Sequence, residues 1–477
     1  MNAPSPKMLR RGWCPSTLKP MKTGDGWLVR LHPPGARLVP AQLRRIAALA
    51  REHGNGLIEI SARGNMQLRG VTGESHPRLV ATLLAERLVD EHDGDGPQRL
   101  TLTSPLAGLP RHCEERQRRS NPEAAALDAP LDCFAMPVLG LAEGKTRGLS
   151  MTGVGGPPPA LIDAPALAAD IESRARSITG LPAKFSVIVD DGGGHSLDAF
   201  AGDIRIVGAA PGMAVIGLAD RAWLGPVAAT ETAAAVATIL ARFGALRVDV
   251  PDAIRRLRDL SPGTLPTLCD LQATSAPPPR PAPRRAGLFS LGTDGFAALV
   301  GLPFGRADAE TLNRLAAAAE THHCLEIRFS PWRGIAFRGM AEADAGALLD
   351  DAGALGLIVG DDDPRLSVQA CAGAPACLRA ETAAMADAAR LAEAIAPLLA
   401  AGLTLHVSGC VKSCAQPGAC DLTLVGHGGR YGVVVAGTAR DGALAELDVS
   451  GVMARLQPGQ DIYARLLAAG RIAGPRA

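Results

Sequence analysis

The sequence has no excess of charge of either sign, because 49 Lys and Arg residues stand against 48 Asp and Glu, a net charge of +1. This balance excludes a strongly basic nucleic-acid-binding protein. The sequence also lacks an uncharged apolar run of the roughly 18 residues needed to cross a bilayer, and its first residues contain no apolar signal segment. We therefore expect a soluble cytoplasmic protein with no nucleic-acid or membrane partner.

Two further signatures are absent. No G-x-G-x-x-G fingerprint opens a βαβ unit, which argues against a nicotinamide or flavin Rossmann domain. Reducing equivalents are therefore expected from a separate donor, such as a ferredoxin or an NADH-dependent reductase. The ten cysteines do not have the dense, even spacing of a secreted disulfide framework, which indicates free thiols in reducing surroundings.

What the sequence does contain is a group of four cysteines near its C-terminal end. They form a C-x5-C pair and a C-x3-C pair separated by 32 residues: Cys371, Cys377, Cys410 and Cys414. Four thiolates on two short loops can hold an iron–sulfur cluster, whose irons take cysteine sulfur as ligand. Structural zinc sites pair their ligands at C-x2 to C-x4 spacing, which is narrower than the first pair. We predict a [4Fe–4S] cluster, with a zinc site or four unrelated core cysteines as the alternatives.

A proline-rich segment divides the chain. Residues Ala273 to Arg285 read ATSAPPPRPAPRR, and five prolines in thirteen residues indicate a linker with polyproline character. A second break, near Arg111 to Pro130, carries charges without an apolar face, which indicates a solvated surface insertion.

The sequence repeats itself across the linker. Residues 24–71 match residues 295–340 at a shift of 269 positions, which aligns Arg69-Gly70 with Arg338-Gly339. The segment LIEI at 57–60 matches CLEI at 324–327 at a shift of 267. Both copies read as strand, helix, strand, strand, and two such units can pair about a pseudo-two-fold axis. Chance similarity between two amphipathic patterns is the alternative.

An α/β stretch follows each copy. In the first we predict a buried strand at 184–190 and a helix at 230–243; in the second, a helix at 381–401 and a strand at 403–407 that leads to Cys410. One helical turn is expected to place Cys410 and Cys414 on the same side.

Local positive charge stands out in this neutral sequence. Arg63 and Arg69 bracket GNMQL, Arg30 lies on a predicted strand, and Lys184 opens another. Arginine donates two parallel hydrogen bonds to a carboxylate, and lysine adds a point charge. Our hypothesis is that these cations converge on one ligand that bears many carboxylates. Ordinary surface salt bridges are the alternative.

These residues carry a family resemblance. The cysteine pattern with DLTLVG and YGVVVAG, the duplicated half-domain, SARGNMQLRG and LPAKF are similar to the siroheme-dependent nitrite and sulfite reductase superfamily over nearly the whole chain. The resemblance implies an internally duplicated α+β fold, with two ferredoxin-like half-domains and two α/β domains. The implied limits are 10–80 for the first half-domain, 81–272 for the first α/β domain on the tetrapyrrole-binding side, 273–286 for the linker, 287–350 for the second half-domain and 351–477 for the iron–sulfur cluster domain.

The resemblance also implies a ligand. Arg30, Arg63 and Lys184 occupy positions where the reductases bind tetrapyrrole carboxylates. The run CPSTLKPMKTGDGWLVR most resembles a branch that acts in aerobic cobalamin biosynthesis and binds precorrin-3A as substrate instead of carrying siroheme. The reductases place a second lysine two positions after the first, and this chain has Ser186 there, which argues against sulfite reduction.

Membership of that branch implies an oxygen-dependent monooxygenase that hydroxylates precorrin-3A at a meso carbon and closes a γ-lactone from the ring A acetate. The cluster would relay single electrons, and a mononuclear non-haem iron would activate O2. A two-histidine, one-carboxylate set is usual for such iron, and His195, near Asp190 and Asp191, is the most suggestive histidine. A polar turn histidine without metal is the alternative.

No catalytic residue is assigned from the sequence. A siroheme-dependent nitrite or sulfite reductase, with siroheme as its cofactor, and a non-catalytic tetrapyrrole carrier remain the other readings of the whole chain.

Overall fold

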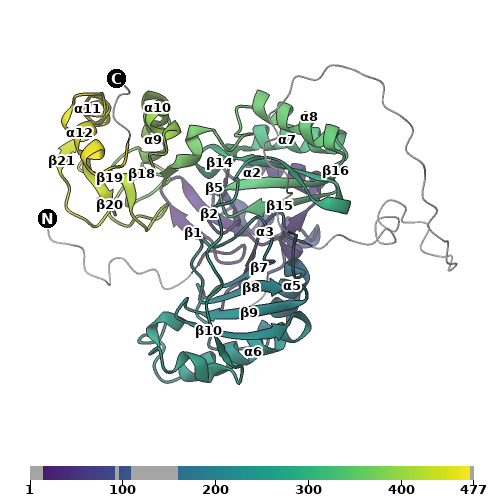
Figure 1. Ribbon diagram of the computed structural model, residues 1–477. Coiled ribbons are helices and arrows are strands. Elements are labelled where there is room, and N and C mark those ends of the chain that lie inside the picture. Colours follow the sequence, from purple (N-terminus) through teal and green to yellow (C-terminus); the bar gives the residue numbers. More distant parts are fainter. Residues whose placement is uncertain (1–13, 92–95, 109–158, 473–477) are drawn as a thin grey trace, which may run out of the picture.

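A computed structural model describes residues 14–91, 96–108 and 159–472. The described residues form four sheets, of five, six, five and five strands, with helices against them (Figure 1). The predicted charged insertion at 111–130 lies outside the described residues. No helix in the described part of the chain is both long and apolar enough to cross a membrane.

The first copy of the repeat folds as two antiparallel strands, a helix, a two-stranded hairpin and a second helix. Its sheet has the order β1-β2-β5-β4-β14. The elements are β1 (Met21–Thr23), β2 (Gly26–Leu31), α2 (Pro40–His53), β4 (Leu57–Ile60), β5 (Met66–Val71) and α3 (Ser75–Ala85). Helix α2 buries Leu43, Ile46 and Ala50 against the sheet, as their helical spacing predicts.

The second copy has the same order of elements. They are β12 (Gly287–Ser290), β13 (Phe296–Gly301), α7 (Ala309–Thr321), β15 (Glu326–Ser330), β16 (Gly334–Met340) and α8 (Glu342–Ala354). The two copies exchange edge strands: β3 (Arg37–Leu38) pairs with β15, and β14 (Arg306–Asp308) pairs with β4. Helices α2 and α7 pack against each other, so the copies share one core.

Strand register corrects the shift that the sequence suggested for the segment LIEI. Ile60 pairs with Met66, and Phe329 pairs with Ile335, so these strands are related by 269 positions like the rest of the repeat. The 267 alignment is wrong. A slip of two residues keeps every side chain on the same face of a strand, so apolar alternation cannot distinguish the two alignments.

An α/β domain follows each copy, and the two share one pairing scheme. Each sheet has two parallel pairs followed by two antiparallel pairs, and the first sheet adds a third antiparallel pair at its edge. The first has β6 (Thr101–Thr103), α5 (Ala164–Ala175), β7 (Val187–Asp190), β8 (Ile204–Ala210), β9 (Met213–Leu218), β10 (Ala222–Ala228) and α6 (Ala229–Leu246). The second has β17 (Val368–Ala370), α9 (Ala384–Ala394), α10 (Ala396–Ala400), β18 (Leu405–Ser408), β19 (Cys420–His427), β20 (Arg430–Gly437), β21 (Ala445–Leu447), α11 (Val449–Arg455) and α12 (Asp461–Ala468).

Two local predictions need correction. The helix expected at 381–401 is two helices, α9 and α10, that meet at Ile395, two residues before Pro397. The proline-rich segment is not wholly irregular, because β11 (Ala273–Thr274) pairs with β10. Arg280 in the same segment forms ion pairs of 2.6 Å with Asp190 and Asp198, so the segment is docked on the first α/β domain.

Candidate functional site

The four cysteines lie on loops at one edge of the second α/β sheet. Cys371 directly follows β17, and Cys410 follows β18. These strands are parallel neighbours, so their carboxyl ends meet at the same edge. Cys371, Cys377 and Cys410 are half-buried and Cys414 is exposed. The segment from Cys410 to Cys414 forms turns and not the helical turn that the sequence suggested.

The two cysteine loops meet, because the N–H of Gly409, next to Cys410, donates a hydrogen bond to Sγ of Cys371. Burial raises the pKa of Cys371, and the charges of Cys414 and Cys377 raise it further. Burial likewise raises the pKa of Cys410, with contributions from Cys371 and Cys377. The structure therefore brings the two predicted pairs together.

Backbone groups around the thiols fit a sulfur-ligated cluster. The Gly409 N–H donates a 3.1 Å hydrogen bond to Sγ of Cys371, and such bonds are a feature that tunes iron–sulfur sites. A Cβ at Gly409 would lie 2.7 Å from Cβ of Ala380, so only glycine allows this close approach. Among the described residues no three His, Cys, Asp or Glu side chains are close enough to share one metal ion. Each cysteine of a [4Fe–4S] site binds a different iron, so its thiolates stand farther apart than the ligands of one ion.

The first cysteine loop is held by the first half-domain. Arg69 on β5 is buried, donates a 2.8 Å hydrogen bond to the Ala376 carbonyl, and pairs with Asp25 and Glu59 at 2.7 and 3.3 Å. The Gly24 N–H donates to the same carbonyl at 3.0 Å. Arg69 was predicted to contact substrate; here its guanidinium is directed at protein acceptors.

The other three predicted cations lie elsewhere. Arg30 on β2 is half-buried and donates to Oε1 of Gln67 at 2.7 and 3.1 Å. Arg63, at the tip of the β4–β5 hairpin, is exposed to solvent, yet protein surrounds it closely enough that burial lowers its pKa and the charge of Arg256 lowers it further. Lys184 is exposed. The charge of Arg30 also lowers the pKa of Arg63, so these two cations lie near each other. Arg69, by contrast, contacts the first cysteine loop.

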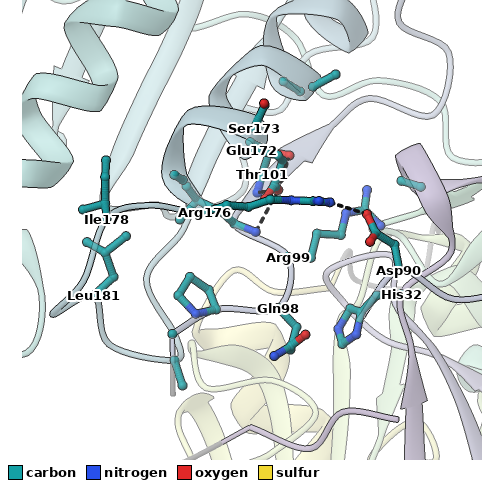
Figure 2. Close-up of a pocket in the computed structure, with 18 of the residues that line it drawn as sticks. His32, Asp90, Gln98, Arg99, Thr101, Glu172, Ser173, Arg176, Ile178 and Leu181 are labelled. Atoms are coloured by element: carbon teal, nitrogen blue, oxygen red, sulfur yellow. Dashed lines mark hydrogen bonds and ion pairs between the residues drawn. The ribbon is translucent and has the colours of Figure 1, made fainter. Parts of the chain in front are cut away.

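A cavity of about 1020 Å³ lies between the first half-domain and the first α/β domain (Figure 2). Among the described residues its wall holds six arginines and three carboxylates: Arg37, Arg99, Arg176, Arg247, Arg255 and Arg328, with Asp90, Glu172 and Asp252. Arg99 donates one long hydrogen bond, 3.5 Å, to the carbonyl of Gly64. Burial lowers the pKa of Arg99, and Glu172 opposes that effect. This excess of cations suits a ligand with several carboxylates.

A histidine–carboxylate pair stands in the wall of the same cavity. Nδ1 of His32 lies 2.8 Å from Oε1 of Glu91, and the Thr17 hydroxyl donates to that oxygen at 2.7 Å. An ionised carboxylate only accepts, so Nδ1 carries the proton and Nε2 presents a lone pair. Burial lowers the pKa of His32, the hydrogen bond to Glu91 raises it, and the charges of Arg30 and Arg99 lower it. The imidazole is therefore a neutral acceptor near pH 7.

Sequence reasoning missed both Arg99 and His32. A signal for His32 was present, because it lies two residues after Arg30 and so on the same side of an extended chain. Arg99 had no such signal, since its place in the cavity depends on how the two domains meet.

Ser186 is buried with its hydroxyl lacking a hydrogen-bond partner among the described residues. Its N–H donates to Asp203 at 3.0 Å, and Asp203 pairs with Arg256 at 2.8 Å. A lysine at this position would add a second cation beside Arg256.

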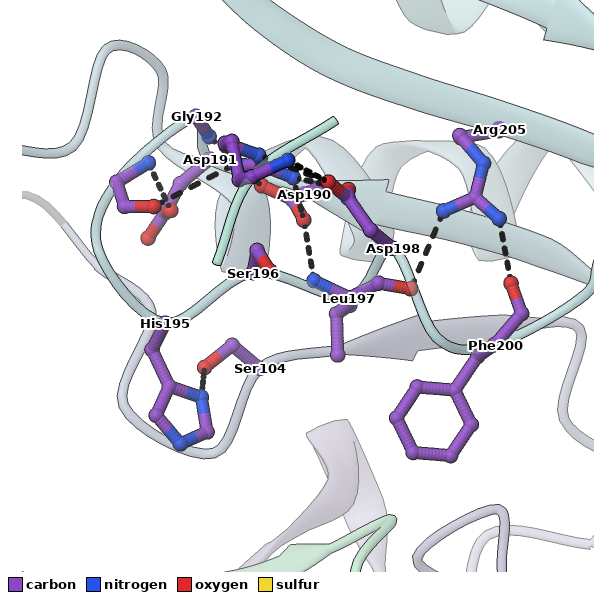
Figure 3. A network of polar contacts seen from close by, with 12 residues as sticks. Ser104, Asp190, Asp191, Gly192, His195, Ser196, Leu197, Asp198, Phe200 and Arg205 are labelled. Atoms are coloured by element: carbon purple, nitrogen blue, oxygen red, sulfur yellow. Dashed lines mark hydrogen bonds and ion pairs between the residues drawn. The ribbon is translucent and has the colours of Figure 1, made fainter. Parts of the chain in front are cut away.

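His195 lies in a polar network after β7, not in a metal site (Figure 3). Its Nδ1 is 2.8 Å from the Ser104 hydroxyl, and its Nε2 is 3.1 Å from the Arg284 carbonyl. Asp190 accepts from Arg280 and from the Leu197 N–H. Both ring nitrogens have protein partners, which favours the polar histidine without metal over the iron ligand.

Comparisons with known proteins agree with this architecture. The model of the nitrite/sulfite reductase ferredoxin-like half domain matches residues 19–86 and 291–355. A precorrin-3B synthase from Sinorhizobium sp is 31% identical over 468 residues, which cover 93% of this chain and 87% of that protein. The structure of the Mycobacterium tuberculosis NirA protein matches with a TM-score of 0.61 at 19% identity, covering 93% of this chain and 84% of the other. The duplicated α+β fold with two ferredoxin-like half-domains is confirmed.

Proposed function

The chain belongs to the precorrin-3B synthase family, and on that premise we propose that it hydroxylates precorrin-3A with O2 and closes a γ-lactone on the macrocycle. The observation that carries the proposal is the match to a precorrin-3B synthase along nearly the whole length of both proteins. The arginine-rich cavity supports it independently, because the substrate is a tetrapyrrole with many carboxylates.

Substrate binding is assigned to the cations at the domain junction. Arg99 lines the cavity, and the charges of Arg30 and Arg99 both act on His32 in its wall. Arg30, Arg63 and Lys184 are proposed as further contacts for the substrate carboxylates. Bidentate pairing with carboxylates fixes the orientation of the macrocycle as well as its affinity.

His32 is the group we assign to proton transfer. With Nδ1 held by Glu91, its Nε2 can accept the proton of the ring A carboxyl group as that group's oxygen bonds to the ring carbon, and can pass it to the oxygen that becomes the meso hydroxyl; Glu91 stabilises the imidazolium in between. O2 takes two electrons from the substrate and two from the external donor, so that one of its atoms enters the product and the other leaves as water. This role requires a neutral imidazole, and burial keeps His32 neutral.

The cysteine loops are assigned to a [4Fe–4S] cluster held by Cys371, Cys377, Cys410 and Cys414. Such a cluster transfers single electrons from an external donor, here a ferredoxin or an NADH-dependent reductase. Gly409 and Arg69 shape the loops that hold it. For the mononuclear iron the described residues offer no matching ligand set, so no residue and no step is assigned to it.

The test is anaerobic purification with iron and sulfide analysis, followed by precorrin-3A, a reductant and air. We expect about four irons and four sulfides per chain, as the composition of a [4Fe–4S] cluster requires, and a hydroxylated lactone detected by mass. A Cys371→Ser variant should bind precorrin-3A but form no product. A tetrapyrrole carrier would bind the substrate and leave it unchanged in the wild type as well.

The reductase reading is examined in the same preparation. Strong Soret and red absorbance as purified, with turnover of nitrite or sulfite, would replace the present proposal by a siroheme-dependent reductase. Ser186 in place of a second lysine favours the monooxygenase.

A further inference from the structure

The tip of the β15–β16 hairpin holds an arginine in a backbone conformation that suits glycine. Arg333 has φ 64°, and Gly64, its counterpart 269 positions earlier at the tip of β4–β5, has φ 62°. A non-glycine residue is unfavourable in this region, because its Cβ is crowded against the backbone. Such a conformation persists where the surrounding structure holds it, and it is common at functional sites.

The Arg333 side chain reaches the cysteine loops. Its Nη2 donates a 2.7 Å hydrogen bond to the carbonyl of Ala415, the residue after Cys414. The guanidinium also interacts electrostatically with Cys371 and Glu59, and burial lowers its pKa. Gly305 makes room for the side chain, because a Cβ there would lie 2.9 Å from Cδ of Arg333.

The neighbouring residue fixes the hairpin tip on its other side. The ring of Trp332 lies 4.8 Å from that of His195, edge to face, and 4.9 Å from that of Phe200. The tip therefore contacts both α/β domains, and Arg333 is held beside the cysteine loops.

We propose that Arg333 is a positioning residue for the redox group in the cysteine loops, which fixes the 410–415 loop and favours the reduced state by its positive charge. The inference rests on the cluster assigned in the proposed function. Reduction adds one negative charge, and a nearby cation in a partly buried site stabilises that charge. Arg333 thereby raises the reduction potential.

The test is an anaerobic redox titration of the full-length holoprotein, followed by electron paramagnetic resonance. Arg333→Gly relieves the backbone strain and removes the cation, whereas Arg333→Lys keeps the charge. Arg314→Gln is the control, because Arg314 is exposed on α7 and its replacement changes the net charge as Arg333→Gly does. We expect Arg333→Gly to lower the potential by at least the 59 mV that corresponds to a tenfold lower ratio of reduced to oxidised cluster for one electron. Arg333→Lys should retain most of the potential, and Arg314→Gln should not change it.

An unchanged potential in Arg333→Gly, with wild-type iron and sulfide content, overturns the inference and leaves the proposed function standing. A wild-type protein without iron and sulfide overturns the cluster assignment and this inference together. Loss of iron from Arg333→Gly but not from Arg333→Lys supports the loop-fixing part of the role.

Discussion

Arg69 and Arg338, which stand 269 positions apart in the two half-domains, make the same contact: each donates a guanidinium hydrogen bond to an alanine carbonyl. Arg69 bonds Ala376 at 2.8 Å, and Arg338 bonds Ala107 at 3.2 Å. The two alanines are themselves 269 positions apart. The loop after β6 is therefore the structural counterpart of the first cysteine loop after β17. The loop after β17 carries cysteines, whereas the loop after β6 carries Ser104, which contacts His195.

This equivalence provides a matched pair of variants. Arg69→Met removes the buried cation from Asp25 and Glu59, of which Glu59 keeps Arg306 as a partner; breaking a buried ion pair typically costs about 3–5 kcal/mol of stability. It also releases the carbonyl of Ala376, so we expect faster loss of iron from the purified protein. Arg338→Met breaks the equivalent contact at Ala107, in the loop after β6 and not in a cysteine loop, and should be destabilised without faster iron loss. Equal rates of iron release in the two variants would contradict the role given to Arg69.

The cysteine assignment separates ligands from ordinary core thiols. Cys420 on β19 is buried, and burial raises its pKa to about 11, which marks an inert thiol. We expect Cys371→Ser to lose most of its iron and sulfide, whereas Cys420→Ser should keep both. Iron and sulfide analysis of anaerobically purified protein provides the measurement. Normal cluster content in Cys371→Ser would remove that residue from the ligand set.

Arg99 is expected to contribute more to substrate binding than a surface arginine. Hydrogen bonds to charged groups contribute about 1.5–3 kcal/mol, so Arg99→Met should weaken binding of precorrin-3A roughly 10- to 150-fold. Arg174→Met is the control, because Arg174 is exposed on α5 and pairs along its own helix with Asp170. Equilibrium binding measured at two salt concentrations gives both the affinity and the electrostatic contribution to the binding free energy. Equal affinities of the two variants would place the substrate outside the cavity.

The His32–Glu91 pair predicts a specific pH dependence of turnover. His32 must be neutral to accept a proton, so activity falls below its pKa. Glu91 raises that pKa, while Arg30 and Arg99 lower it. We expect Glu91→Gln to move the acidic limb of the rate profile to lower pH, because the pKa of His32 then falls further. His32→Gln should bind substrate but lose roughly 10²–10⁴ in rate and lose the limb itself. A limb that stays in place in both variants belongs to another group.

Local patterns in the sequence sufficed for some features and not for others. The cysteine loops could be predicted because ligand spacing and the strands that lead to Cys371 and Cys410 are both local. The break between α9 and α10 had a local signal, Pro397, that the apolar periodicity outweighed. The cavity could not be foreseen, because His32, Arg99 and Arg328 come from three segments that meet only in the folded chain. The repeat was visible, but its register needed the paired strands.

The network after β7 contains two groups whose stability effects oppose each other with pH. Burial raises the pKa of Asp191 from 3.8 to about 6 in the folded protein, so the protonated carboxyl group favours folding. This contribution to the free energy of unfolding is fully present below pH 3.8 and is lost as the pH rises through 6. Burial lowers the pKa of His195 from 6.5 to about 4, so its contribution is present above pH 6.5 and is lost as pH falls through 4. Each shift corresponds to about 3 kcal/mol, and between pH 4 and 6 the two nearly cancel.

The Asp191→Asn variant should reveal the contribution of His195 to the pH dependence of stability. The amide keeps the acceptor that bonds the Gly193 N–H, at 2.8 Å in the wild type, and it does not titrate. We expect the variant to gain stability over the wild type progressively from pH 4 to pH 6, by up to about 3 kcal/mol. Urea denaturation midpoints at several pH values supply the comparison, with Asp170→Asn as the control, because the Asp170 side chain is partly exposed on α5. A constant difference across this range would mean that Asp191 is already ionised in the folded protein at pH 4, and that its carboxylate is stabilised by Arg280 and Arg338 more than burial destabilises it.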